Sequence, residues 1–208
     1  QKGFIISVTA IGEVTPNQFV KRSTAQKGEL LCVTGDLGAA YLGLTLLERE
    51  KKIFLENPKV QPDLEGEKYV VGRLLKPEAR KDIVAYFAEE GIVPTAMIDV
   101  SDGLSSEILH ICKQSAVGCV LYEEKIPIEE ETKLAAFKFN LDPTACALSG
   151  GEDYELLFTI AQDDYEKIKD NAAISVIGYL TDAEAGAHII TKGGSKHPIT
   201  AQGWNALK

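Results

Sequence analysis

The chain has 208 residues, 45% of them hydrophobic, and a net charge of −9 at pH 7, which allows one large domain or two small ones with a substantial core. The acidic balance argues against a nucleic-acid or acidic-membrane partner, because either would require a basic surface. No apolar run approaches the roughly 18 residues of a membrane span, and neither end has a signal-peptide pattern, so we expect a soluble, cytoplasmic protein.

The first part of the chain predicts a strand that lacks a neighbour. Residues 4–12 are apolar, and nothing precedes them with which they could pair. We therefore expect that upstream sequence is missing, that residues 1–14 belong with that missing part, and that residues 15–208 form a domain of their own. Residues 13–28 are polar and rich in turn formers, and they include the basic residue Arg22.

A strand, a glycine turn and a helix are predicted next. Residues 30–35 are apolar, Gly35 and Gly38 flank a short turn, and leucines of an amphipathic helix follow. The two glycines are either tight-turn residues or backbone that lines an anion site. The full dinucleotide-binding and P-loop patterns are both absent.

The rest of the chain alternates short helices and strands. We expect helices over 69–75, 79–90, 104–112, 129–137, 142–147 and 163–171. We expect strands over 92–98, 117–121, 126–128, 154–160 and 174–180, and a hairpin of 187–191 with 195–199. The four cysteines have no Cys-x-x-Cys spacing and are interpreted as reduced.

Two carboxylates stand where the strand over 92–98 gives way to a helix. We expect Asp99 at the end of the strand and Asp102 at the helix N-cap, with Gly103 relaxing the turn from the strand to the helix. Two such carboxylates repel one another, and the next basic residue is Lys113, so a cation is one way to neutralise them. Oxygen ligands at a helix N-terminus suit Mg²⁺ that carries phosphate. The alternative is that both acids serve only in a helix cap and a turn.

A second segment, residues 148–160, places Gly150 and Gly151 before two acids and a strand. Bare backbone here would admit a ligand, with Glu152 directed at its cationic part. Alternatively, the glycines form a turn and the acids are solvated. Trp204, the only tryptophan, lies in the C-terminal tail. It either folds back on the body or stacks on a planar ligand.

Three segments resemble thiamine-monophosphate kinase, a family related to aminoimidazole ribonucleotide synthetase and selenophosphate synthetase. They are Asp-Val-Ser-Asp-Gly-Leu at 99–104, Ser-Gly-Gly-Glu-Asp-Tyr-Glu-Leu at 149–156 and the turn at 33–38. The resemblance implies the family's C-terminal domain, an α+β fold whose mixed β-sheet is flanked by helices. It implies direct transfer of the γ-phosphoryl group of ATP to thiamine monophosphate, which requires positioning and charge neutralisation more than an acid–base residue.

The resemblance also implies roles for individual residues. Asp99 and Asp102 correspond to Mg²⁺ ligands and Ser101 to an ATP contact. Arg22 corresponds to a phosphate-binding arginine, although Arg-Ser-Thr-Ala at 22–25 departs from the family's Arg-x-Gly-Ala. Glu152 and Trp204 correspond to contacts with the thiamine substrate.

Two other functions remain open from the sequence. One is a superfamily enzyme that uses ATP with a different acceptor, resembling selenophosphate synthetase or a hydrogenase-maturation enzyme. The other is a nucleotide-binding module without turnover. For the kinase we expect ATP and thiamine monophosphate as small-molecule partners and a homodimer of the full-length protein. We expect this chain alone to be inactive, because half of the phosphate site would lie upstream.

Overall fold

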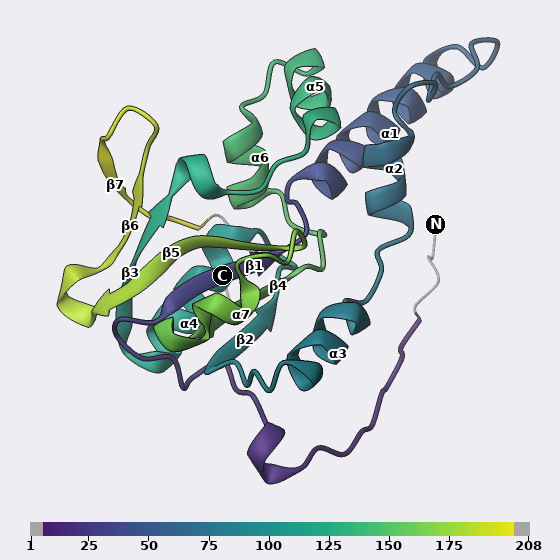
Figure 1. Ribbon diagram of the computed structural model, residues 1–208. Coiled ribbons are helices and arrows are strands. Elements are labelled where there is room, and N and C mark those ends of the chain that lie inside the picture. Colours follow the sequence, from purple (N-terminus) through teal and green to yellow (C-terminus); the bar gives the residue numbers. More distant parts are fainter. Residues whose placement is uncertain (1–5, 202–208) are drawn as a thin grey trace.

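The computed structural model describes residues 6–201. Within them, a mixed seven-stranded sheet has the order β2-β4-β1-β5-β3-β6-β7, in which only β3 and β6 are parallel neighbours (Figure 1). Its strands are β1 (Leu30–Thr34), β2 (Ala96–Asp99), β3 (Val117–Tyr122), β4 (Leu156–Ile160), β5 (Ile174–Asp182), β6 (Ala187–Ile190) and β7 (Lys196–Pro198). The α+β fold expected from the sequence is thereby confirmed.

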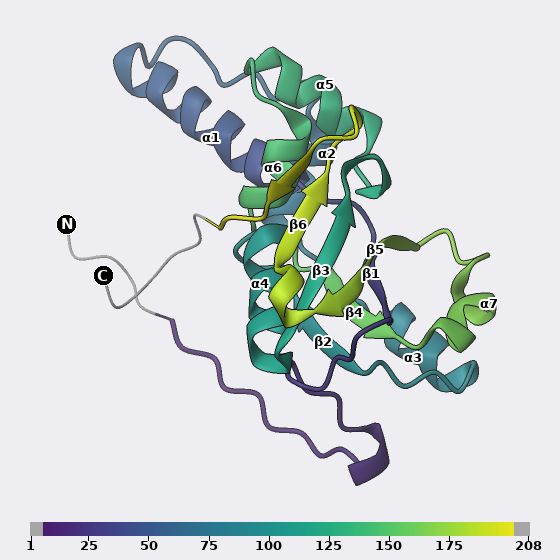
Figure 2. The ribbon, with the colours of Figure 1, turned by 90° about the vertical axis from the view of Figure 1, so that its left-hand side faces the viewer.

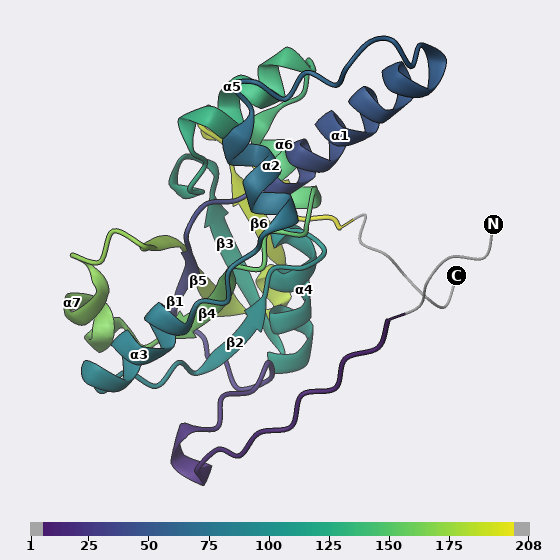
Figure 3. The same cartoon turned by 90° about the vertical axis from the view of Figure 1, so that its right-hand side faces the viewer.

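Helices cover both faces of the sheet. They are α1 (Ala39–Glu56), α2 (Lys68–Leu75), α3 (Lys81–Glu89), α4 (Leu104–Ser115), α5 (Glu130–Lys138), α6 (Pro143–Ser149) and α7 (Tyr165–Ile168). Figure 2 shows α4 on one face, with α3 and α7 on the other, and the opposite view in Figure 3 agrees. Helices α1, α2, α5 and α6 gather beyond one end of the strands (Figure 1).

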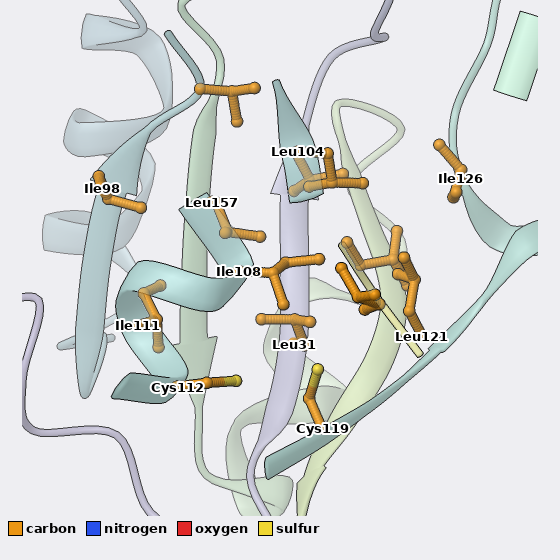
Figure 4. Packing of buried hydrophobic residues seen from close by; sticks show 14 of the residues in the cluster. Leu31, Ile98, Leu104, Ile108, Ile111, Cys112, Cys119, Leu121, Ile126 and Leu157 are labelled. Atoms are coloured by element: carbon orange, nitrogen blue, oxygen red, sulfur yellow. The ribbon is translucent and has the colours of Figure 1, made fainter. Parts of the chain in front are cut away.

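Alternation along the strands explains the two faces of the core. Leu31 and Leu157 point to the face that α4 covers, where they meet Leu104 and Ile108 (Figure 4). The next residue of each strand points the other way, so that Phe158 packs with side chains of α3 and α7. Successive strand residues face opposite sides of a sheet, and both sides here are apolar, so these strands read as continuous apolar runs.

The structure corrects several predicted elements. Residues 126–128 are not a strand: Pro127 lacks an N–H donor for a sheet, and Ile126 is apolar because it packs into the core from a connection. The strand predicted over 92–98 begins only at Ala96, after Pro94. The helix predicted over 163–171 contracts to α7 and a preceding 3-10 turn.

The N-terminal segment also differs from its prediction. Residues 6–14, the described part of the predicted terminal strand, have no regular secondary structure and are exposed to solvent. Phe4 and Ile5 lie outside the described residues. A strand needs a hydrogen-bonded neighbour, and this segment pairs with no strand in the described part of the chain. The division into residues 1–14 and 15–208 stays a prediction.

Candidate functional site

The two motif segments pack against each other through their backbones. The N–H of Glu152 donates to the carbonyl of Ser101 at 2.8 Å, and the N–H of Tyr154 donates to the carbonyl of Val100 at 2.9 Å. The N–H of Val100 in turn donates to the carbonyl of Glu155 at 2.7 Å. These bonds continue the pairing of β2 with β4, so segments more than 45 residues apart become one loop cluster at the ends of two neighbouring strands.

Two glycines permit this close approach. Gly151 has φ +71°, and a Cβ there would lie 2.4 Å from the carbonyl oxygen of Ser101. Gly103 has φ +103°, and its Cβ would lie 2.8 Å from the carbonyl oxygen of Leu148. Any side chain at either position would meet backbone atoms and force the two segments apart. The two glycines therefore serve close packing. The space beside the Gly151 Cα is occupied by the backbone of Ser101 and Asp102 and is not open to a ligand.

The predicted site acids lie on this loop cluster with exposed side chains. Asp99, Asp102 and Glu152 are exposed and Ser101 is half-buried. No salt bridge of the described residues includes any of the three acids. Their charges act on a common neighbour: the pKa of Tyr154 is raised, first by its hydrogen bond to Glu152, then by burial and by the charges of Glu152, Asp99 and Asp102. The structure thus brings these acids together.

The expected N-cap role of Asp102 is wrong. Helix α4 begins at Leu104 with Gly103 as its N-cap, and no side chain caps it. Asp102 lies one residue too early for its carboxylate to reach the first free N–H groups of the helix. The alternative that this acid only caps the helix is removed, and its exposed carboxylate has no structural partner in the described part of the chain.

The backbone of Arg22 lies beside β2 toward the end away from Asp99. The hydroxyl of Ser115, the last residue of α4, donates to the Arg22 carbonyl at 3.4 Å. The N–H of Met97 donates to the carbonyl of Lys21 at 3.0 Å, which ties residues 21–22 to the strand edge. Arg22 and Asp99 line one cavity of about 490 Å³. This hollow is lined by neither Ser101, Asp102 nor Glu152, so it joins Arg22 to Asp99 alone among the predicted site residues that the structure describes. Trp204 lies outside the described residues.

Sequence reasoning missed a buried acid beneath the Asp-Ser-Asp turn. Glu107, in the first turn of α4, is 2% exposed. Its Oε1 accepts from Ser101 Oγ at 3.3 Å and from the N–H of Asp102 at 3.2 Å. Burial raises the pKa of Glu107 above its usual value. The signal was available, since an acid near the start of a helix often reaches back to an N–H group before it.

Sequence reasoning also missed two buried acids in the second motif. Asp153 accepts from the N–H groups of Gly38 and Ala40 at the start of α1, at 2.8 and 3.3 Å. Glu155 is 1% exposed and lies between two arginines, Arg73 and Arg80. Gly38 and Gly35 therefore serve buried carboxylates. Of the alternatives for these glycines, the structure supports turn and packing residues, and the N–H of Gly38 also donates to the buried Asp153 carboxyl group.

The ion pairs of Glu155 fix the second motif to the helices before it. Arg73 Nη2 lies 2.9 Å from Oε1 and Arg80 Nη1 lies 2.9 Å from Oε2, while the hydroxyl of Thr34 donates to Oε2 at 2.5 Å. A Cβ at Gly35 would lie 2.3 Å from Oε1. Within the second motif, Glu152 and Tyr154 are thus exposed, whereas Asp153 and Glu155 are held inside.

The exposed carboxylates of Asp99 and Asp102 offer oxygen donors, but too few to enclose a metal ion by themselves. Among the described residues, no group of three or more His, Cys, Asp or Glu side chains could hold a metal ion alone. Mg²⁺ is commonly held by only one or two carboxylates, and water and substrate phosphates complete its shell. The exposed pair Asp99 and Asp102 fits that kind of binding.

The fold agrees with the chain's likeness to known proteins. Residues 26–191 match the family described as AIR synthase related protein, C-terminal domain. The chain belongs to this family. No helix in the described part of the chain is long and apolar enough to cross a membrane.

The chain is also similar to individual proteins, among them thiamine-monophosphate kinases. The thiamine-monophosphate kinase of Buchnera aphidicola subsp. Schizaphis graminum is 36% identical over 89% of this chain and 55% of its own length. The solved structure of AaThiL complexed with AMPPCP and TMP has a TM-score of 0.71 and 30% identity, over 91% of this chain and 55% of that one. The hydrogenase maturation protein HypE in complex with ATP, at 15% identity and a TM-score of 0.67 over 94% of this chain and 56% of its own, shares the fold.

The resemblance to thiamine-monophosphate kinases found in the motifs is thus confirmed along nearly the whole chain. The chain spans about half the length of the curated relatives it matches, from 55% of the Buchnera enzyme to 60% of the Bacillus subtilis one. The family membership is therefore a property of this domain. The activity of the whole protein is a separate question and is treated as a proposal.

Proposed function

We propose that this chain supplies the nucleotide- and substrate-binding domain of a thiamine-monophosphate kinase. The reaction is Mg²⁺-assisted transfer of the γ-phosphoryl group of ATP to the phosphate of thiamine monophosphate, which yields thiamine diphosphate and ADP. The observation that carries the proposal is the junction of the two motifs, where three exposed acids without ion-pair partners lie together. A 30% identical protein, AaThiL, forms a complex with AMPPCP, an ATP analogue, which supports ATP as the nucleotide.

Each residue has a proposed task in this transfer. Asp99 and Asp102 would hold Mg²⁺, which when bound neutralises phosphate charge that the acidic surface would otherwise repel. Arg22 would bind a phosphate across the cavity that it shares with Asp99. Ser101, fixed by Glu107, would orient the nucleotide. Glu152 and Trp204 would contact the thiamine portion.

Positioning is the main contribution of the chain to the rate. Phosphoryl transfer in line between two phosphates requires two anionic substrates to be held together, with no nucleophile or base from the protein. The backbone bonds between residues 100–101 and 152–155 set the distance between the proposed metal end and the proposed thiamine end of the site. The rigid loop cluster therefore determines where the two substrates meet.

The whole protein is part of the proposal. Because the chain spans about half the length of its relatives, we propose that further phosphate-binding groups come from a second domain. The 208-residue chain alone should then form no measurable thiamine diphosphate. We further propose that the complete enzyme is a cytoplasmic homodimer.

The test is product analysis with the natural protein that carries this chain. It is incubated with Mg²⁺-ATP and thiamine monophosphate, and thiamine diphosphate is followed by mass. Selenide is run in parallel as another acceptor, because the sequence leaves open an enzyme that resembles selenophosphate synthetase. Thiamine diphosphate formation supports the kinase. Formation of ADP only with another acceptor, or ATP binding without any ADP, would reject the kinase in favour of another enzyme or of a non-catalytic module.

A further inference from the structure

Tyr154 is held in a conformation that its neighbours must impose. It has φ +53°, in the left-handed region that side chains other than glycine rarely adopt. Glu152 shares this conformation with φ +64°. The hydrogen bonds of the Tyr154 N–H to Val100 and of the Val100 N–H to Glu155 fix the backbone on both sides. The effect is that Glu152 and Tyr154 are both presented to solvent, although the acids between and after them are buried.

The Tyr154 side chain makes one specific contact. Its hydroxyl donates to Glu152 Oε2 at 3.1 Å. Tyr154 is 38% exposed and belongs to none of the core clusters of the described residues. The hydrogen bond places an exposed aromatic ring beside the Glu152 carboxylate, which is not one of the proposed metal ligands.

This arrangement favours one class of ligand. Aromatic faces attract cations through their quadrupole, and nearby carboxylates add to that attraction. A planar cation gains from both the ring and the charges, whereas a neutral ring of the same shape gains only from stacking. Two separate features, the Tyr154 ring and the Glu152 carboxylate, therefore select for positive charge delocalised over an aromatic ring.

We infer that Tyr154 is a specificity-determining residue that selects the cationic ring of the acceptor. Its hydroxyl orients the Glu152 carboxylate, and its ring contacts the charged heterocycle directly. The inference rests on the proposed function, because thiamine monophosphate carries a positively charged thiazolium ring. It goes beyond that function by assigning the choice between cationic and neutral acceptors to a side chain outside the metal and phosphate contacts.

The test measures binding, so that it is independent of phosphoryl transfer. Calorimetry with the natural protein compares thiamine with a neutral thiazole that lacks the quaternary nitrogen. Replacement of the ring by Tyr154→Leu should weaken thiamine binding about tenfold and leave the weaker binding of the neutral thiazole nearly unchanged. Tyr154→Phe, which keeps the ring and loses the hydroxyl, should weaken thiamine binding by about threefold.

A second exposed tyrosine provides a matched control. Tyr165→Leu changes another exposed tyrosine, 43% exposed on α7, and should leave binding unchanged. Equal thiamine binding by the Tyr154→Leu variant and the wild type, equal losses for both thiazoles, or no thiamine binding by the wild type would each overturn the inference. If thiamine binds as expected while no thiamine diphosphate forms, the proposed kinase fails and the cation site stands.

Discussion

Glu155 is predicted to be the largest single contributor to the stability of the loop cluster. Its carboxylate accepts two charged hydrogen bonds of 2.9 Å, from Arg73 and Arg80, and one of 2.5 Å from Thr34. The variant Glu155→Gln keeps the size of the side chain. It removes the charge and turns one amide N–H₂ group toward donors, so at least one of these bonds is lost.

The loss of stability in Glu155→Gln depends on the ion pairs that the two arginines keep. Breaking a buried ion pair by removing one partner costs about 3–5 kcal/mol. Arg73 keeps Asp36 at 3.6 Å and Arg80 keeps Asp82 at 3.0 Å, so neither guanidinium is left without a counter-charge. We therefore expect the lower end, a loss of about 3 kcal/mol in the free energy of unfolding. For a chain of this size that corresponds to a fall of roughly 6–12 °C in Tm.

Urea unfolding followed by circular dichroism measures this loss. The matched control is Glu152→Gln, the same change three residues earlier at an exposed side chain, which should alter the free energy of unfolding by no more than about 0.5 kcal/mol. The reasoning is refuted if the two variants unfold at the same urea concentration. That result would mean that the buried pairs only compensate their own desolvation.

Three further predictions concern the same loops. Burial raises the pKa of Asp153 to about 7. As the pH rises from about 4 to 7, the Asp153 carboxyl group therefore loses its proton in the unfolded chain but keeps it in the folded chain. Over that range the free energy of unfolding of the wild type, measured in urea, should fall by up to ~4 kcal/mol relative to that of Asp153→Asn. Parallel pH profiles of the two proteins would contradict this. Gly151→Ala should destabilise by at least about 1 kcal/mol more than Gly91→Ala, because both have positive φ but only Gly151 faces backbone within 4 Å. Equal losses in thermal unfolding would count against close packing. For the natural protein, Asp99→Asn should raise the Mg²⁺ concentration for half-maximal rate at least about tenfold, and the exposed-residue control Asp163→Asn should not; an unchanged Mg²⁺ dependence would remove Asp99 from the metal site.

Most elements could be predicted from local patterns, and the errors have local causes. Strands β1, β3, β4 and β5 can be predicted within a few residues because helices cover both faces of the sheet and the strand sequences are rich in apolar residues. The apolar residues 126–128 gave the same pattern without being a strand. Burial of a connection produces the same composition as burial of a strand, and only the missing donor of Pro127 distinguishes them.

The exposed acids of the site can be predicted from the sequence, whereas the buried contacts that hold their loops in place cannot. Asp99, Asp102 and Glu152 stand beside glycines at strand ends, which is a local signal. The arginine partners of Glu155 come from α2 and from the residue that precedes α3, more than 70 residues earlier in the chain. No local pattern connects an acid to an arginine at that separation. The buried role of Glu155 therefore required the fold, and so did the contact of Asp153 with the start of α1.

The central claim is direct phosphoryl transfer at the site that contains Asp99. We would supply the natural protein with Mg²⁺, thiamine monophosphate and ATP labelled in its γ-phosphate, and trace the label in the wild type and in Asp99→Asn. The account predicts label in thiamine diphosphate with the wild type and a loss of about a hundredfold or more in the variant. Label found only in free phosphate, or equal labelling of thiamine diphosphate by both proteins, would contradict it.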